Sequence, residues 1–281
     1  ATCNAIRYCG AKPLFVDVSM HTLGLSADIF EEYLHKHTEI RDDNSCWKRN
    51  TNIKISACLP MHTYGFPVDL GKINKICDQY NIPLIEDAAE SLGSYYQNKH
   101  TGTVGNLSTL SFNGNKIITT GGGGMILTND EKIAKQAKHI TTTAKVPHKW
   151  AFNHDNIGYN YRLPNINAAL GVAQMELLPN YIKNKRKIAH QYQKWGNKYG
   201  VKFVKEQQNT KPNYWLNTAI MQNREQLDLF LEETNNNNIM TRPAWTPMHK
   251  LDINKDCQHS DMKNTEWLAD RIVNVPSSII L

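Results

Sequence analysis

The segment Ile82-Pro83-Leu84-Ile85-Glu86-Asp87-Ala88-Ala89-Glu90-Ser91 indicates the fold class. Its apolar first half follows a helical pattern directly and ends in carboxylates, as expected for a buried strand that carries polar groups to its carboxyl end. Open α/β proteins bind their ligands at that end of a parallel sheet. Asp87 is therefore a candidate site residue, and the alternative is that it only caps the following helix.

Strands and helices alternate on both sides of this segment. Apolar runs predict strands at residues 14–18, 53–59, 82–86, 107–112 and 125–128, all in one sheet. Ser26 and Asp69 can each cap a helix, because apolar residues follow both at three- and four-residue spacing. This alternation is typical of βαβ units and predicts an α/β fold with a mostly parallel sheet flanked by helices.

The pattern changes after residue 164. A helix is expected from Asn165, broken or kinked at Pro179 ahead of a basic helical stretch that reaches about Lys198. The residues expected to face inward from its first turns are apolar and helically spaced: Ile166, Ala169, Leu170 and Ala173.

Beyond Gly200 the pattern is that of a second, smaller unit. Strands are expected at 201–204, 214–221 and near 239–242, with a helix at 224–233. We therefore expect a large domain over residues 1–164, connecting helices over 165–200 and a small α+β domain over 201–281.

Composition bounds the class of protein. Of 281 residues, 40% are apolar and 21% charged, which predicts a globular chain with a sizeable core. No apolar run of about 18 residues and no leader is present, so we expect a cytoplasmic protein without a membrane partner. The chain opens on what reads as the middle of a domain. We therefore expect a fragment, incomplete at its N-terminus and open to being incomplete at its C-terminus.

Charge and cysteine usage favour no metal or nucleic-acid site. The six cysteines lack CxxC spacing and predict small buried thiols rather than a zinc site or disulfides. Net charge is +6, and the basic run at residues 183–187 is interpreted as a solvated helix face, since no recognition motif accompanies it. A mild positive excess also suits an anionic small molecule.

A second polar loop leaves the strand expected at 107–112. Ser111-Phe112-Asn113-Gly114-Asn115-Lys116 is followed by four consecutive glycines at 121–124. Pyridoxal phosphate needs an amine for its Schiff base, a carboxylate for its ring nitrogen, and hydroxyls or backbone amides for its phosphate. Lys116, Asp87 and Ser111 supply these groups. A dinucleotide loop does not fit, because the glycines lead into a strand, and a Walker loop does not fit, because Lys116 precedes them.

Several motifs, in this order, resemble one family. They are Glu86-Asp87-Ala88-Ala89-Glu90-Ser91-Leu92-Gly93, Gly102-Thr103-Val104-Gly105, the Lys116 loop with its glycines, Gly158-Tyr159-Asn160-Tyr161-Arg162 and Asn167-Ala168-Ala169-Leu170-Gly171. Together they resemble the sugar-nucleotide aminotransferases of the DegT/DnrJ/EryC1/StrS family along the whole chain. The resemblance implies a fold-type I, pyridoxal-phosphate-dependent transferase.

One segment points to a branch of that family. Residues 50–69, with Pro60-Met61-His62-Thr63-Tyr64-Gly65, most resemble enzymes that aminate C4 of 4-keto-6-deoxy-N-acetylhexosamine nucleotides on the route to legionaminic acid or bacillosamine. The resemblance thus implies an enzyme of polysaccharide biosynthesis, lipopolysaccharide included. Its partners would be a nucleotide sugar and an amino donor, glutamate.

The resemblance also implies a role for each matching residue. Lys116 matches the Schiff-base lysine that also moves protons, Asp87 the partner of the pyridine nitrogen, and Ser111 a phosphate contact. Glu90 falls beside the cofactor's ring. Asn160 matches the residue that reaches the phosphate of a neighbouring subunit's cofactor, which implies a homodimer with shared active sites.

Substrate contacts are more open. The candidates are His62, Arg162, Arg242, Trp245 and His249. For His62 the alternative is a hydrogen-bonded structural histidine, and for Arg162 an interface role. For the segment 242–249 the alternative is ordinary strand and loop packing.

Two rival functions remain at this point. One is a dehydratase of the same family, in which histidine replaces the Schiff-base lysine, so Lys116 argues against it. The other is a catalytically silent fragment that only dimerises. It is motivated by the family's upstream phosphate-binding segment, which would lie ahead of residue 1.

Overall fold

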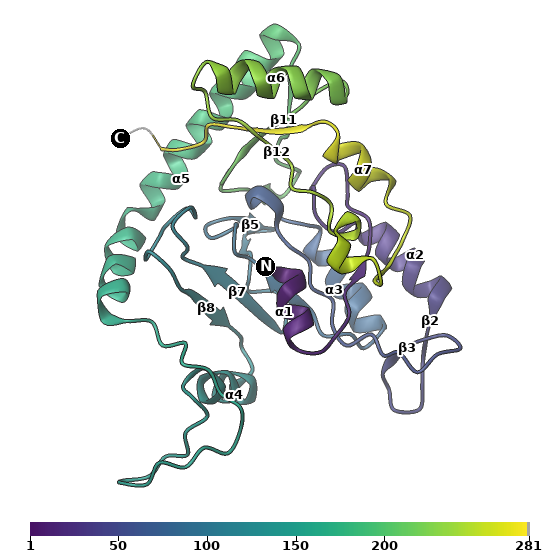
Figure 1. Ribbon diagram of the computed structural model, residues 1–281, viewed down its shortest axis with the longest axis vertical. Coiled ribbons are helices and arrows are strands. Elements are labelled where there is room, and N and C mark those ends of the chain that lie inside the picture. Colours follow the sequence, from purple (N-terminus) through teal and green to yellow (C-terminus); the bar gives the residue numbers. More distant parts are fainter. Residues whose placement is uncertain (280–281) are drawn as a thin grey trace.

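The computed structural model describes residues 1–279 and has an α/β architecture (Figure 1). Its main sheet has the strand order β4-β7-β8, formed by Ile85–Asp87, Leu107–Ser111 and Gly124–Leu127. β4 and β7 are parallel, whereas β8 is antiparallel to β7. Two parallel bridges, Cys58 to Leu84 and Met61 to Asp87, extend the sheet beyond β4.

Two capped helices cover this sheet, as the sequence predicts. α2 (Ala27–His37) begins where the Ser26 hydroxyl accepts a hydrogen bond from the Ile29 N–H. α3 (Leu70–Gln79) begins where the Asp69 carboxylate accepts one from Lys72. Their apolar faces enter one core with strand residue Leu84, built largely from Phe30, Leu34, Leu70, Ile73 and Ile76. Burial of each such side chain stabilises the fold by about 1.5–3 kcal/mol.

Two predicted strands do not join this sheet. The strand expected at 14–18 is only β1 (Leu14–Phe15), and it pairs with β13 (Gln258–His259). The reason is Asp17, which is buried and accepts hydrogen bonds from Asn264 and Thr265 at the start of α7 (Lys263–Ala269). The range 53–59 forms no regular strand, because most of it is solvent-exposed and only Cys58 bridges to the sheet.

Short elements complete this half of the chain. The helices are α1 (Thr2–Tyr8) and α4 (Glu131–Thr141), with a 3-10 turn at Thr63–Gly65. β2 (Thr38–Ile40) and β3 (Cys46–Lys48) form a hairpin, and β5 (Tyr95–Tyr96) lies between β6 (Lys99–His100) and β10 (Thr210–Lys211). Four of the six cysteines are buried, as expected: Cys46, Cys58, Cys77 and Cys257.

A single helix, α5 (Asn165–Tyr199), runs past Pro179, so the prediction of a helix broken at this residue is wrong. Proline removes only its own N–H, and the carbonyl deprived of a partner belongs to Met175, which is exposed to solvent. The helix ends at Gly200, whose φ of 76° suits glycine. Residues 1–279 contain no helix that is long and apolar enough to cross a membrane.

Two expectations about the faces of α5 are also wrong. Its first turns do not face a core in this chain, because Ile166 and Leu170 are 86% and 43% exposed and Ala169 and Ala173 are exposed too. Conversely, the basic run at 183–187 is not wholly solvated. Lys185 in its middle is buried, because its ammonium donates hydrogen bonds to the backbone carbonyls of Trp215 and Ser277.

The last part of the chain builds a second, antiparallel sheet in the order β12-β14-β11-β9. Its strands are Arg242–Pro243, Ile272–Val275, Asn217–Ile220 and Lys202–Phe203. The helix expected at 224–233 is α6 (Arg224–Asn236), which begins at the cap residue Asn223. It packs on this sheet through Leu227. Two 3-10 turns, Met248–Lys250 and Asp252–Asn254, follow β12. The sequence analysis does not predict β14.

Candidate active site

The site begins at the carboxyl edge of β4 and β7. In the parallel register Asp87 lies opposite Thr109, so Ser111, two residues further along β7, reaches the same edge. One carboxylate oxygen of Asp87 accepts a hydrogen bond from the Ala89 N–H at 3.1 Å. The other accepts one from the Thr2 hydroxyl of α1 at 2.5 Å. The predicted strand-end position of Asp87 and Ser111 thus brings them together.

The loop after β7 returns Lys116 to this edge. Its first turn is closed by the Ser111 hydroxyl, which accepts from the Asn113 N–H, and by the Asn113 carbonyl, which accepts from the Lys116 N–H. The loop then enters β8 through its glycines. At Gly124 a Cβ atom would lie 2.5 Å from the Leu110 carbonyl oxygen, so a side chain would push β8 away from β7.

Glu90 joins Lys116 to this constellation. Its Oε1 lies 3.6 Å from Lys116 Nζ, and its Oε2 accepts a hydrogen bond from the Tyr64 N–H at 2.8 Å. Burial raises the pKa of Glu90, the negative charge of Asp87 adds to this effect, and Lys116 opposes it. An amine and two carboxyl groups therefore share one edge of the sheet.

The amine lies against the first of three packed aromatic rings. The Lys116 Nζ lies 4.4 Å from the ring centroid of Trp215. Trp245, which is 53% exposed, stacks near Trp215 and packs against Tyr64. Tyr64 has a left-handed backbone with φ of 57°, a strained conformation for an aromatic residue. That conformation accompanies the hydrogen bond from its N–H to Glu90, and burial raises the pKa of its phenol to about 12.

His62 lies beneath this edge, fully buried, and is not available to a substrate. One ring nitrogen lies 3.1 Å from Glu86, and the other accepts a hydrogen bond from the Val68 N–H. Glu86 also accepts hydrogen bonds from the N–H groups of the 102–105 loop. Although burial opposes ionisation, these partners together hold the pKa of Glu86 below its ordinary value. The structural alternative for His62 is therefore the one that the geometry favours.

The remaining predicted residues lie elsewhere. Asn160 and Arg162 are exposed, and Asn160 bridges to Thr142 at the base of an arm that projects beyond α4 (Figure 1). Arg242 is exposed on β12, where it donates to Asn235 and to the Thr241 carbonyl. His249 lies 3.1 Å from Glu266 of α7. None of these four contacts Lys116, Asp87 or Glu90 through a hydrogen bond or ion pair described here within residues 1–279.

Three residues of the site escaped the sequence analysis as functional candidates: Thr2, Tyr64 and Trp215. Thr2 and Trp215 carry no local motif, and each reaches the site only through the fold. Tyr64 belongs to the segment that indicates the sugar branch, but its backbone role could not be foreseen.

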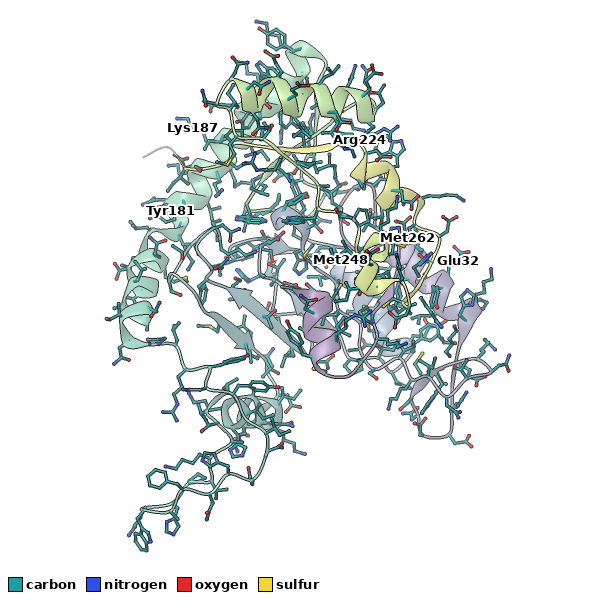
Figure 2. All side chains as sticks on the ribbon, viewed as in Figure 1. Glu32, Tyr181, Lys187, Arg224, Met248 and Met262 are labelled. Carbon is teal, nitrogen blue, oxygen red and sulfur yellow. The ribbon has the colours of Figure 1, made fainter. Side chains whose placement is uncertain are left out.

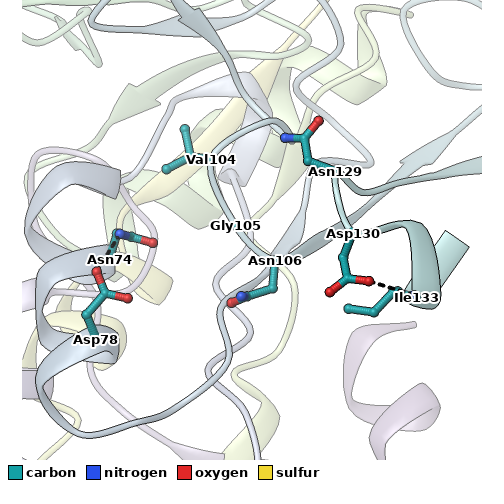
Figure 3. Close-up of a pocket in the computed structure, with 8 residues that line it drawn as sticks. All are labelled: Asn74, Asp78, Val104, Gly105, Asn106, Asn129, Asp130 and Ile133. Atoms are coloured by element: carbon teal, nitrogen blue, oxygen red, sulfur yellow. Dashed lines mark hydrogen bonds between the residues drawn. The ribbon is translucent and has the colours of Figure 1, made fainter.

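A polar pocket lies away from these residues, beside the start of β7 and the end of β8 (Figure 3). It has a volume of about 370 Å³ and is lined by Asn74, Asp78, Val104, Gly105, Asn106, Asn129, Asp130 and Ile133. Several of its polar groups are engaged with one another or with backbone: Asn74 donates to Asp78, and Asp130 caps α4. Residues 1–279 hold no group of three or more metal-ligating side chains arranged for an ion.

Comparison with known proteins places this geometry in a family. The chain is 37% identical to the putative pyridoxal phosphate-dependent aminotransferase EpsN of Bacillus subtilis, over 89% of this chain and 61% of that protein. It is 36% identical to GDP-perosamine synthase of Escherichia coli O157:H7, over 99% of this chain and 71% of that enzyme. It thus spans only about three fifths of the first relative's length.

Solved structures share the fold at lower identity. PseC of Helicobacter pylori, an aminotransferase involved in the biosynthesis of pseudoaminic acid, superposes with a TM-score of 0.87 at 20% identity, covering 99% and 71% of the two chains. Escherichia coli GDP-4-keto-6-deoxy-D-mannose-3-dehydratase superposes with a TM-score of 0.81 at 24% sequence identity, covering 98% of this chain and 72% of that enzyme. The family model of the DegT/DnrJ/EryC1/StrS aminotransferases matches residues 1–280. Pyridoxal phosphate is the cofactor of this family. The chain therefore belongs to the DegT/DnrJ/EryC1/StrS aminotransferase family.

Proposed function

We propose that the protein transfers an amino group, supplied by glutamate, to the C4 keto group of a nucleotide-linked 4-keto-6-deoxy sugar. The observation that carries this proposal is the amine of Lys116, held 3.6 Å from Glu90 at the edge of the sheet where Asp87 ends β4. A sugar-nucleotide aminotransferase requires a lysine there, whereas a dehydratase of the family would carry histidine.

The residues present fit the cofactor. The Asp87 carboxylate accepts hydrogen bonds only from Thr2 and Ala89 among its described partners, which leaves lone pairs for a protonated ring nitrogen. Lys116 is 14% exposed, so its amine is reachable but largely desolvated. The Ser111 hydroxyl and the loop N–H groups beside it would hold the phosphate. Asn160 would reach the phosphate of a partner subunit.

Each side chain then has a task. When bound, the cofactor supplies an electron sink that lets an amino group pass from an amino acid to a ketone. Asp87 would keep positive charge on the ring nitrogen by electrostatic attraction. Lys116 would move the proton at the sugar C4 atom, as a positioned general acid and base. The exposed face of Trp245 and the buried ring of Tyr64 would exclude water on the substrate side.

The sugar class has two supports that differ in detail. The segment at residues 60–65 resembles the branch acting on N-acetylhexosamine nucleotides, toward legionaminic acid or bacillosamine. A relative that aligns with 99% of this chain is a GDP-perosamine synthase. The shared chemistry is amination of a nucleotide-linked keto sugar, and both fit polysaccharide or lipopolysaccharide synthesis. We retain the cytoplasmic location expected from the sequence as part of the proposal.

A homodimer is part of the proposal because many large apolar side chains between α4 and the middle of α5 are exposed. The arm between α4 and α5 and the first turns of α5 carry large uncovered side chains: Trp150 (75% exposed), Phe152 (77%), Ile157 (81%), Tyr161 (73%), Ile166 (86%) and Val172 (62%). Large apolar side chains exposed in this number favour a subunit contact. A second copy of this chain would cover it and bring Asn160 toward a partner's site.

The test supplies full-length protein with glutamate and either a GDP-linked or a UDP-linked 4-keto-6-deoxy sugar. We expect an amino sugar and 2-oxoglutarate in equal amounts from at least one of them, and none from Lys116→Ala. Loss of a sugar hydroxyl would instead identify the dehydratase. Absence of any product, with cofactor bound and both sugars intact, would contradict the assigned reaction and favour the silent, dimerising alternative.

A further inference from the structure

The amine of Lys116 lies between a carboxylate and an indole ring. Its Nζ is 3.6 Å from Glu90 Oε1 and 4.4 Å from the centroid of Trp215. A cation over an indole face is attracted by the ring quadrupole, and the attraction grows when both groups are desolvated. Lys116 is 14% exposed and Trp215 is 5% exposed, so water screens this contact weakly.

Trp215 is fixed in place by hydrogen bonds on several sides. Its indole N–H donates to the Asn115 carbonyl at 2.7 Å, next to Lys116 itself. Its backbone N–H donates to the Asn213 side chain at 2.8 Å, and its carbonyl accepts from Lys185 Nζ at 3.0 Å. The orientation of the ring against Lys116 is therefore set by the Lys116 loop itself and by Asn213 and Lys185, which lie outside the motifs of the family.

Lys185 is an unusual partner for a backbone carbonyl. It is 7% exposed, and its ammonium also donates to the Ser277 carbonyl at 2.7 Å. Among residues 1–279 its ammonium pairs with backbone carbonyls and with no carboxylate, and burial lowers its pKa to about 8. Lys187, two residues on, instead lies on the outer side of α5 (Figure 2). Burying an ammonium without a carboxylate is unfavourable, so this one has a specific structural task.

We propose that Glu90 and Trp215 clamp the free amine of Lys116, and that Lys185 is the positioning residue that holds Trp215 against it. The inference rests on the proposed function, in which the lysine must stay within reach of the sugar carbon while it is not attached to the cofactor. The clamp holds the amine there, because the Glu90 carboxylate and the indole face of Trp215 both attract an ammonium group. The nearby charged groups are Asp87, which acts on Glu90, and Lys185, which contacts the Trp215 backbone.

The test measures the proton affinity of Lys116 directly. In full-length protein stripped of cofactor, acetylation of Lys116 by acetic anhydride is followed by peptide mass spectrometry across a pH series. The midpoint reports protonation, and the plateau reports access. Trp215→Leu should lower the midpoint by about 0.5 to 1 pH unit, whereas Trp215→Phe, which keeps a π face, should stay closer to the parent. Trp267→Leu, which removes a ring packed on Arg271, should change nothing and serves as the control.

The positioning role has its own variants. Lys185→Met removes the donors but keeps an apolar stem, and it should lower the Lys116 midpoint in the same direction as Trp215→Leu. Lys185→Arg keeps the donors and should restore most of the effect. If Trp215→Leu does not fold, Trp215→Met takes its place.

Two results would overturn the clamp. One is an unchanged midpoint in Trp215→Leu with a higher plateau, which would mean that the ring only covers the amine. The other is a midpoint in Lys185→Met equal to the parent's. Failure of the proposed function is distinguished separately, because it would appear as parent protein that never attaches pyridoxal phosphate to Lys116.

Discussion

At the residue scale, the function depends on which carboxylate faces the cofactor nitrogen. Asp87 has the strand-end position and the free lone pairs, whereas Glu90 is engaged by Tyr64 and Lys116. We expect Asp87→Asn to lower the turnover number by roughly 100-fold or more, because the amide cannot stabilise a charged ring nitrogen. The cofactor absorbance spectrum should change with it. An unaltered spectrum and turnover number would show that the wrong acid was chosen.

A second carboxylate, Glu86, has a structural task that can be measured. It accepts backbone N–H groups from Gly102, Val104 and Gly105 at 2.6–2.8 Å. Glu86→Gln replaces one carboxylate oxygen with an NH2 donor that faces these N–H donors, and it should lower the free energy of unfolding by about 2–4 kcal/mol at pH 7. Because the folded pKa of Glu86 lies below its unfolded value of 4.5, this advantage is present above that pH. Denaturant titrations should show the difference between parent and variant shrinking as pH falls below about 4.5.

At the element scale, local signals were sufficient for some parts of the fold and insufficient for others. The caps at Ser26 and Asp69 were predictable because a cap and its helix lie within a few residues of each other. The position of Asp87 at the end of a strand and that of Lys116 in the loop after the next strand were predictable for the same reason. The short β1 was not, because Asp17 is held by residues nearly 250 positions away. The burial of Lys185 likewise depends on the carbonyls of Trp215 and Ser277.

That buried lysine gives α5 a pH-dependent stability. Burial lowers the pKa of Lys185 from 10.5 to about 8, so the unfolded chain binds more protons between these pH values. Stability attributable to Lys185 therefore rises with pH across this range, by an amount on the order of 3 kcal/mol. Urea unfolding of the parent and of Lys185→Met should show the free energy of unfolding of the parent rising relative to that of the variant as the pH increases from about 8 to 10.5. A difference independent of pH would contradict the burial.

At the scale of the whole molecule, we propose the division into residues 1–164, 165–200 and 201–281 as a functional one. One core joins all three parts, since Tyr64 and Phe66 pack with Ala189 and with Tyr214 and Trp215. The site is built where these parts meet. Motions of the last part would therefore move Trp215 and Trp245 relative to Lys116.

The exposed arm extends this argument to two subunits. If Asn160 serves a partner's cofactor, mixing full-length Lys116→Ala with full-length Asn160→Ala should restore activity, because some heterodimers contain one site free of both changes. The assay is amino-sugar formation after subunit exchange has been verified, with each variant folded and severely impaired alone. A mixture no more active than its parents would indicate a site completed within one chain.

The attachment of the cofactor tests the central claim most directly. Full-length protein incubated with pyridoxal phosphate, reduced with borohydride and digested should carry one stable pyridoxyl group, on the peptide that contains Lys116. Lys116→Ala should carry none, and Lys185, although buried with a lowered pKa, should stay unmodified in both. A parent protein that binds the cofactor but is labelled at another lysine, or at none, would contradict the account.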